Sequence, residues 1–178
     1  LDPTQVALDP VAAYQRHGEG GRAIVFCISR KHAAITSEEF NSAGIPCAVI
    51  DGTMAKGLRA ETLQRHRCGE LRVLASIGVL TEGYDDPGVS VAILARGFGH
   101  PGLYIQCCGR VLRPFDGKEK AIIIDLIGNC WEHGSPDYPW TYSLSGKAMK
   151  SNVLKDAIRQ CAKCGAIFAA GKSCPNGC

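Results

Sequence analysis

The sequence predicts an α/β fold in three layers around a parallel sheet, followed by a small cysteine-rich domain. Short apolar segments alternate with helical segments of about 10 to 14 residues, which is typical of strand–helix–strand units with right-handed crossovers. The apolar segments contain few polar residues, as strands do when helices cover both faces of their sheet. Four of the ten cysteines lie within the last 18 residues and indicate the second domain.

Five apolar segments are expected to form the strands. They are RAIVFCI (22–28), IPCAVID (45–51), LRVLASI (71–77), VSVAILA (89–95) and KAIIIDLI (120–127). The expected helices cover residues 11–17, 31–44, 54–68, 101–113 and 152–160. Gly44 favours the end of the second helix, and Pro101 suits the first turn of the fourth. In such a sheet, functional residues are expected at the carboxyl ends of the strands.

Composition limits the class of protein and its domain organisation. With 178 residues, 46% hydrophobic and 21% charged, the chain is not wholly disordered, and it has room for one ordinary α/β domain and a small appendage but not for two large domains. It contains no apolar run of membrane-spanning length, so no membrane partner is expected. Cysteines within apolar segments, such as Cys27, indicate a reduced, cytoplasmic protein. We expect a lead-in helix (1–19), the α/β domain (20–128), an extension (129–155) and the cysteine-rich domain (156–178).

The segment QCCGRVLRP (106–114) has the most informative polar pattern. On a helix, Gln106, Arg110 and Arg113 fall within about 60° of one another, and the apolar residues occupy the opposite arc. Two guanidinium groups one turn apart suit a multiply charged oxyanion such as a triphosphate. A solvated polar face on a helix that covers the sheet is the alternative interpretation of this pattern.

The connection GVLTEGYDDPG (78–88) is rich in glycine and acidic residues. Gly83 permits the close approach of a ligand, and the Asp85 carboxylate could accept hydrogen bonds from a ribose. A turn built by aspartate and glycine residues explains the same composition without a ligand.

The chain contains, in this order, AIVFCISRKHA, DGTMAKGLRAETLQRHRCGE, VLASIGVLTEGYDDPGVSVAI and QCCGRVLRPFDGKEKAIIIDL. Together these segments resemble motifs IV, IVa, V and VI of the second RecA-like lobe of superfamily 2 helicases, the DEAD/DEAH-box-like group. The resemblance covers about residues 20–128, and DLIGNCWEHGSP (125–136) is similar to the continuation in phage and bacterial members. It implies that the α/β domain is the C-terminal RecA-like lobe of an ATP-dependent DNA or RNA helicase or translocase.

The resemblance also assigns roles to individual residues. It implies that Arg110 and Arg113 contact the γ-phosphate of ATP, with Arg113 as the arginine finger. Gln106 would couple the nucleotide site to the other lobe, and Asp85 with Gly83 would flank the ribose. An arginine finger stabilises the charge that develops on the transferred phosphoryl group. Contacts with the nucleic-acid backbone would come from Ser29, Arg30, Gly52, Ser76 and Thr81, with Lys56 and Arg59 as further candidates.

Two motifs of a complete ATPase are missing from the sequence. It contains neither a GxxxxGK[ST] phosphate loop nor a DEAD/DEAH-like acidic box, the elements that cradle the phosphates and hold Mg²⁺. We therefore expect ATP and Mg²⁺ to be shared with an N-terminal RecA-like lobe upstream of Leu1, and this chain alone not to hydrolyse ATP. The stretch RGFGHPGLY (96–104) departs from the family, so no role is assigned to residues 97–100.

The same stretch contains a competing motif. Gly97, Gly99 and Gly102 form the pattern G-x-G-x-x-G between an expected strand and an expected helix, and Asp125 ends the next strand. This pattern is typical of NAD- or FAD-binding Rossmann domains. Against it, the fingerprint normally lies in the first strand–helix–strand unit, and such a domain has no use for Gln106 and two arginines on one helix face.

The C-terminal cysteines follow the pattern C-x2-C-x9-C-x3-C. Two close pairs on a glycine-containing loop supply the four thiolates that a tetrahedral, structural Zn²⁺ requires. Two disulfides or a redox CxxC are the alternatives. A zinc ribbon also suggests another function, a non-catalytic nucleic-acid-binding module in which Lys163 and Lys172 meet phosphates, and the formal charge of +3 permits such a partner. The expected zinc ligands are Cys161, Cys164, Cys174 and Cys178.

Overall fold

The computed structural model describes residues 9–80, 84–137 and 158–178 of the chain. The chain divides into two compact units, Leu1–Ile127 and Gly128–Cys178, and the described part of each contains its own sheet. The first unit contains the five strands that the apolar segments predict. They are β1 (Ala23–Phe26), β2 (Cys47–Asp51), β3 (Val73–Ile77), β4 (Val91–Leu94) and β5 (Ile122–Asp125).

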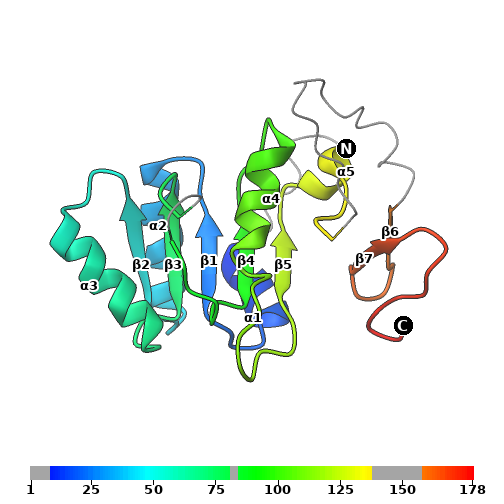
Figure 1. The fold of residues 1–178 in the computed structure, drawn as a ribbon, viewed down its shortest axis with the longest axis horizontal. Coiled ribbons are helices and arrows are strands. Elements are labelled where there is room, and N and C mark those ends of the chain that lie inside the picture. Colours follow the sequence, from blue (N-terminus) through cyan, green and yellow to red (C-terminus); the bar gives the residue numbers. More distant parts are fainter. Residues whose placement is uncertain (1–8, 81–83, 138–157) are drawn as a thin grey trace. The chain divides into compact units, whose positions relative to one another are not determined.

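The strands lie in the order β2-β3-β1-β4-β5, and every neighbouring pair is parallel (Figure 1). Ala23 at the start of β1 lies beside Val73 of β3 and Val91 of β4. Every residue of β1 and β4 is buried. Because successive side chains of a strand point to opposite faces, complete burial requires cover on both faces, as the lack of polar residues predicts.

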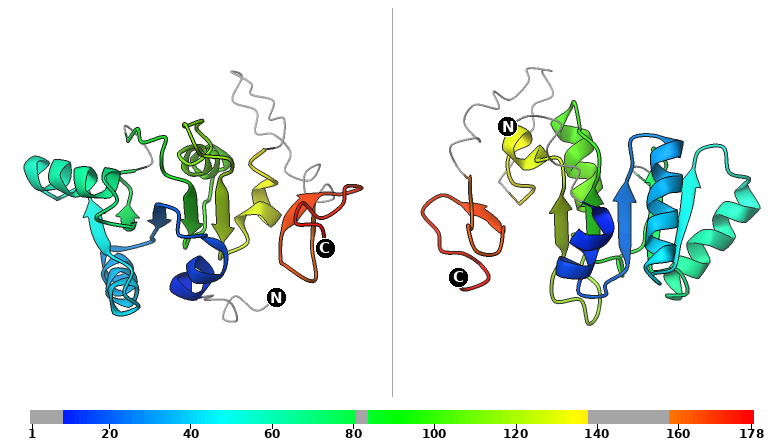
Figure 2. Two further views of the ribbon diagram at one scale, coloured as in Figure 1. Left: turned by 90° about the horizontal axis from the view of Figure 1, so that it is seen from below. Right: turned by 180° about the vertical axis from the view of Figure 1, so that it is seen from behind.

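Helices cover both faces of the sheet. On one face, Tyr14 and Phe40 belong to the same apolar core as Val25, and their ring centroids lie 5.7 Å apart. On the other face, Tyr104 joins a second core with Ile24. Figure 2 shows the sheet between the two helix layers, so the three-layer α/β prediction is confirmed. The helices of this unit are α1 (Pro10–His17), α2 (Arg30–Ser42), α3 (Lys56–Arg67) and α4 (Pro101–Gly109).

Helix α4 is shorter than the sequence predicts. The expected helix over residues 101–113 ends at Gly109, because the chain tightens into turns in which the amide of Arg110 donates to the carbonyl of Cys107 at 3.3 Å. Helix α4 follows β4 and returns toward the amino ends of the strands, where β5 must begin (Figure 1). Arg110 and Arg113 therefore come after this helix and lie toward the amino ends of the strands. The prediction that they share one helix face with Gln106 is wrong, and so is the expectation that they lie at the carboxyl ends of the strands.

The second unit contains a short helix, α5 (Asn129–His133), and an antiparallel hairpin of β6 (Ile158–Gln160) and β7 (Ile167–Ala169). Of the helix expected over residues 152–160, residues 152–157 lie outside the described part of the chain. The prediction is wrong for the last three residues, because their pairing with β7 outweighs local helix propensity. Among the described helices, none combines the length and the apolar character needed to cross a membrane.

Candidate functional site

Two connections of the first unit meet near the end of α4. The connection from β3 to β4 contains Tyr84 and Asp85, and the connection from α4 to β5 contains Arg110 and Arg113. Arg113 forms an ion pair with the Asp85 carboxylate. Arg110 donates a hydrogen bond from Nη1 to the carbonyl oxygen of Tyr84 at 3.0 Å. The fold therefore brings together the segments whose residues the family resemblance assigns to the phosphates and to the ribose.

The Arg113–Asp85 pair is accessible from solvent. The Arg113 side chain is 39% exposed and the Asp85 side chain is 68% exposed. Gln106 is exposed on the surface of α4, whereas Gly83 lies outside the described residues. An exposed guanidinium beside a carboxylate can exchange that partner for a polyphosphate, which also accepts hydrogen bonds in a bidentate arrangement.

A buried polar network fixes the backbone next to Asp85. Arg22 donates two hydrogen bonds to the Asp86 carboxylate, at 2.5 and 2.9 Å, and the Tyr84 hydroxyl donates to the same carboxylate at 2.9 Å. Nδ1 of His66 lies 3.1 Å from the Tyr84 hydroxyl, and Arg22 also donates to the His66 carbonyl at 3.1 Å. The network thus joins the start of β1, the end of α3 and the β3–β4 connection.

Burial and charge shift the pKa values within this network. Burial raises the pKa of Tyr84, and burial together with the Arg22 charge lowers the pKa of His66 to about 4. Burial opposes ionisation of Asp86, but hydrogen bonds from Arg22 and Tyr84 outweigh it and hold the pKa of Asp86 below its ordinary value. No sequence signal identified Arg22 or His66, because Arg22 is 64 positions away from Asp86 and 44 away from His66.

A second cluster lies at the carboxyl ends of β1 and β2. Ser29 caps α2 by accepting a hydrogen bond from the amide of His32 at 3.1 Å. Nε of Arg30 lies 3.0 Å from the Asp51 carboxylate, and its Nη2 donates to the Thr53 hydroxyl at 2.9 Å. The Arg30 side chain remains 62% exposed. This edge therefore presents a helix N-terminus and an exposed guanidinium, two features that bind phosphates.

Asp51 organises the loop that contains Gly52. Its Oδ1 accepts hydrogen bonds from the amides of Thr53 and Met54, at 2.7 and 3.1 Å, and from the Thr53 hydroxyl at 2.8 Å. These hydrogen bonds, with those of Thr53 the largest, hold the pKa of Asp51 below its ordinary value. Arg59 donates to the carbonyls of Asp51 and Gly52 at 3.0 and 3.1 Å, so it supports this loop. Asp51 had no predicted role.

The other predicted nucleic-acid residues differ in exposure. Lys56 is exposed at the start of α3. Ser76 is only 1% exposed within β3, which excludes its side chain from the surface that Ser29 and Arg30 share. Thr81 lies outside the described residues. The structure therefore gathers Ser29, Arg30 and Gly52 at one edge.

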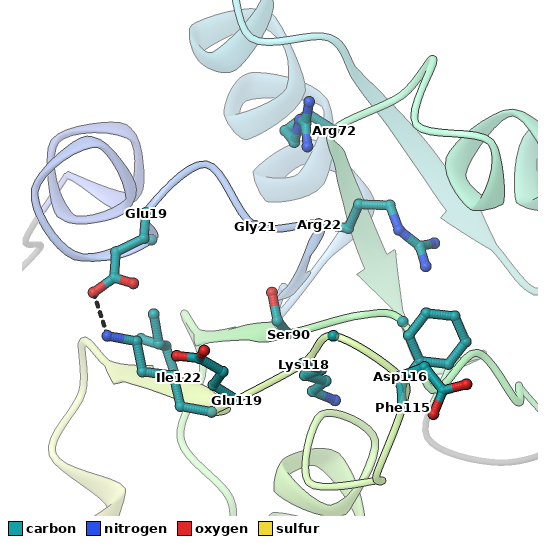
Figure 3. A pocket seen from close by; sticks show the side chains of 14 residues that line it. Glu19, Gly21, Arg22, Arg72, Ser90, Phe115, Asp116, Lys118, Glu119 and Ile122 are labelled. Atoms are coloured by element: carbon teal, nitrogen blue, oxygen red, sulfur yellow. Dashed lines mark hydrogen bonds and ion pairs between the residues drawn. The ribbon is translucent and has the colours of Figure 1, made fainter.

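A hollow of about 440 Å³ lies at the amino ends of the strands (Figure 3). Charged residues line it, and several of them have partners in the same unit. Nζ of Lys120 lies 2.7 Å from the Glu19 carboxylate, and Arg72 donates to the Gly20 carbonyl at 2.9 Å. The ammonium of Lys118 donates to three backbone carbonyls. These three cations therefore serve contacts within the first unit.

The glycine-rich stretch before α4 does not have the geometry of a dinucleotide site. Nδ1 of His100 accepts a hydrogen bond from the amide of Gly102 at 3.0 Å. In a Rossmann domain, the amides at this helix N-terminus point at the pyrophosphate. Here the amide of Gly102 already donates to the side chain of His100, which disfavours the NAD or FAD interpretation.

The C-terminal cysteines form a compact cluster. Their four sulfur atoms lie within 4.8 Å of one another, and 3.5 Å separates Sγ of Cys164 from Sγ of Cys174. Zinc with Zn–S bonds of about 2.3 Å holds its thiolates about 3.8 Å apart, so this donor set fits a structural Zn²⁺. Gly165 and Gly177, with φ angles of 75° and 70°, form turns next to the ligands. The cluster consists of Cys161, Cys164, Cys174 and Cys178.

All four cluster cysteines are free thiols, which disfavours the disulfide alternative. Hydrogen bonds from the backbone amide of Ala166 and from Asn176 lower the pKa of Cys164 to about 6. Hydrogen bonding to Cys164 raises the pKa of Cys178 to about 12. Four thiolates this close repel one another, so keeping them together requires a bound cation.

The helicase conserved C-terminal domain family matches residues 7–114, more than half of the chain. A 51.5 kDa protein of Lactococcus phage (isolate 7-9) is 30% identical over 175 residues, which are 96% of this chain and 38% of the phage protein. The DNA 3'-5' translocase XPB2 of Sulfurisphaera tokodaii is 36% identical over 83 residues, 47% of this chain and 18% of that relative. The chain thus spans well under half the length of these relatives.

The fold agrees with the sequence relationship. The E. coli DEAD-box protein SrmB, whose structure was solved bound to regulator of ribonuclease activity A, aligns with a TM-score of 0.56 and 26% identity, covering 66% of this chain and 69% of that one. The family resemblance of the four ordered motifs is confirmed. The chain therefore belongs to the helicase conserved C-terminal domain family and forms the C-terminal RecA-like lobe of a superfamily 2 helicase.

Proposed function

We propose that this lobe completes the ATP site of a nucleic-acid helicase or translocase whose N-terminal RecA-like lobe supplies the phosphate loop and the Mg²⁺ ligands. One observation carries the proposal: Arg110 and Arg113 contact Tyr84 and Asp85, although Arg113 and Asp85 are 28 positions apart. This contact places two guanidinium groups that suit a triphosphate next to the Asp85 carboxylate, which suits the hydroxyls of a ribose. Family membership supports the proposal, since helicases of this group bind ATP between two lobes.

In this proposal, Arg113 exchanges Asp85 for the nucleotide and stabilises the charge that develops on the γ-phosphoryl group. Arg110 contacts the same phosphate, and Gln106 relays its state to the other lobe. Asp85, with Gly83, accepts hydrogen bonds from the ribose. Mg²⁺ held mainly by the other lobe neutralises phosphate charge when it is bound. Because the chain contains no phosphate loop, the lobe alone does not hydrolyse ATP.

The nucleic acid lies at the opposite end of the sheet in this proposal. The Arg30 guanidinium and the N-terminus of α2 at Ser29 contact backbone phosphates, with Gly52 and Lys56 beside them. Arg59 and Asp51 support the loop from which Gly52 presents its backbone. The similarity to a protein named as a DNA translocase favours DNA as the track. The cysteine cluster binds a structural Zn²⁺ that folds the ribbon.

The decisive experiment measures ATP hydrolysis by the protein that joins this lobe to an ATP-binding lobe. We expect Arg113→Ala and Arg110→Ala to lower the rate by about 10³-fold, because the arginine finger acts in the transition state. Nucleic-acid affinity should be nearly unchanged. Arg65→Ala is the control, since Arg65 forms an exposed pair with Glu70.

The opposite result would favour the non-catalytic zinc-ribbon module. In that case the arginine variants would leave ATP hydrolysis unaffected, while Lys163→Ala and Lys172→Ala would abolish nucleic-acid binding. Both lysines are exposed on the ribbon, so their replacement should not disturb its fold.

A further inference from the structure

The ammonium group of Lys118 donates hydrogen bonds to three backbone carbonyl oxygens. It lies in the connection from α4 to β5, and its Nζ donates to the carbonyl oxygens of Pro87 at 2.9 Å, Val89 at 2.8 Å and Arg113 at 2.9 Å. An ammonium has three N–H donors, so this arrangement satisfies all of them. Neither the family resemblance nor the sequence pattern assigns Lys118 a role.

A tight turn brings the Lys118 side chain back to the backbone of Arg113. The amide of Lys118 donates to the carbonyl of Phe115 at 3.0 Å, and Gly117 within this turn has a φ angle of 76°. That left-handed conformation favours glycine. The chain therefore doubles back after Arg113, and Figure 3 shows Lys118 and Phe115 at the hollow where this turn lies.

The other two acceptors belong to the turn that follows Asp85. In this turn the amide of Val89 donates to the Asp86 carbonyl at 3.2 Å, and the amide of Gly88 donates to the Asp86 carboxylate at 3.2 Å. One ammonium therefore connects the backbone of Arg113 to the segment that contains Asp85. The Arg113–Asp85 ion pair closes the ring between the two segments.

We propose that Lys118 is a positioning residue for ATP hydrolysis, which holds the backbone of Arg113 against the β3–β4 connection and so aims its guanidinium at the γ-phosphate. The inference rests on the proposed function, because it takes Arg113 as the arginine finger. Arg113 lies beyond the last residue of α4, so helix geometry does not orient it. A displacement of about 1 Å in a catalytic group can cost about a hundredfold in rate.

The first test replaces the ammonium in the protein that contains both lobes. Lys118→Met keeps an unbranched side chain that is one atom shorter, and it removes the charge and the three donors. We expect kcat to fall by about tenfold to a hundredfold with KM for ATP nearly unchanged, because the finger is misaligned while the nucleotide still binds. Lys120→Met is the matched control, since Lys120 lies two positions away and pairs with Glu19.

A double-mutant cycle separates positioning from simple stabilisation. If Lys118 acts through Arg113, Lys118→Met adds little to the loss caused by Arg113→Ala in single-turnover hydrolysis. A purely structural role makes the two losses multiply. Thermal melting reports whether each variant is folded, and Lys118→Arg takes the place of Lys118→Met in the cycle if the latter does not fold.

Three results would overturn the inference, and they differ in what else they overturn. Multiplying losses, or a Lys118→Met rate equal to that of Lys120→Met, reject the role of Lys118 and leave the arginine finger intact. An Arg113→Ala variant with the wild-type kcat rejects the proposed function itself, and the positioning role with it.

Discussion

Arg113 forms an ion pair with Asp85, although 28 positions separate the two residues in the sequence. The pair joins the segment after α4 to the β3–β4 connection. In the proposed function, Arg113 binds the γ-phosphate and Asp85 binds the ribose, so a nucleotide replaces this one contact by two contacts with the same ligand. The ion pair then forms in the nucleotide-free state of the site. Breaking it reduces the net free energy of nucleotide binding.

Asp85→Ala should impair recognition of the ribose. Loss of a charged hydrogen-bond acceptor predicts an increase of about tenfold in KM for ATP in the two-lobed protein, with a smaller change for 2′-deoxy-ATP, which has one ribose hydroxyl fewer. The ratio of the two KM values is the measurement. Asp116→Ala is the control, since Asp116 is exposed in the connection to β5. An unchanged ratio would remove Asp85 from the ribose site.

The buried pair of Arg22 and Asp86 should contribute far more to stability than an exposed pair. Their side chains are only 14% and 7% exposed, so Asp86→Ala leaves a buried guanidinium without its counter-charge. We expect the free energy of unfolding to fall by about 3–5 kcal/mol in urea denaturation. Glu70→Ala removes the partner of Arg65 from an exposed pair and should cost less than about 1 kcal/mol. Equal losses would contradict this view of the network.

Local patterns predicted the strands and the family, because both depend on residues close together in the sequence. The apolar runs around Val25 and Ile93 predict two buried strands from local sequence alone, without information on which strands they pair with. The end of α4 was not predictable in this way, since Val111 continues the helical pattern while its backbone is already in a turn. Strand β6 likewise depends on its pairing with β7, which outweighs a helical pattern.

The candidate site was predictable only in part, for a similar reason. Arg110, Arg113 and Asp85 lie in ordered motifs, so a family resemblance identifies them. Lys118 and Arg22 act through partners that folding brings close, at separations of up to 31 and 64 positions. Their charges look like ordinary surface charges until the acceptors are known.

His66 should make stability depend on pH in the mildly acidic range. Burial lowers its pKa to about 4 from 6.5, so the unfolded chain takes up a proton near pH 6.5 that the folded protein takes up only near pH 4. The free energy of unfolding therefore falls as pH decreases through this window, by about 3 kcal/mol in total. Urea denaturation of wild type and His66→Gln between pH 7 and 4 isolates this contribution. A parallel decline in both proteins would assign it to other groups.

Arg30 should contribute one phosphate contact to nucleic-acid binding. Neutralising one phosphate releases condensed counterions, so Arg30→Ala is expected to reduce the slope of log K against log salt by about 1 as well as the affinity. Fluorescence anisotropy with a labelled single strand at several salt concentrations measures both. Arg65→Ala, which removes an equal charge from an exposed pair on α3, should leave the slope unchanged. If both variants reduce the slope equally, only net charge is being measured.

The cysteine cluster should bind one zinc ion per chain. The four sulfur atoms lie within 4.8 Å of one another, so one zinc ion can bind all four. Zinc binds the thiolate form of cysteine, and each thiol that becomes a thiolate releases a proton. Metal analysis of the purified protein should find one equivalent of zinc, and Cys164→Ser should lose most of it. Cys68→Ser is the matched control, because Cys68 is an exposed thiol in the first unit.

A chelator should remove hydrogen-exchange protection from β6 and β7 while β1 keeps its own, since β1 has a separate apolar core. Retention of that protection after complete removal of the metal would show that the hairpin does not depend on zinc.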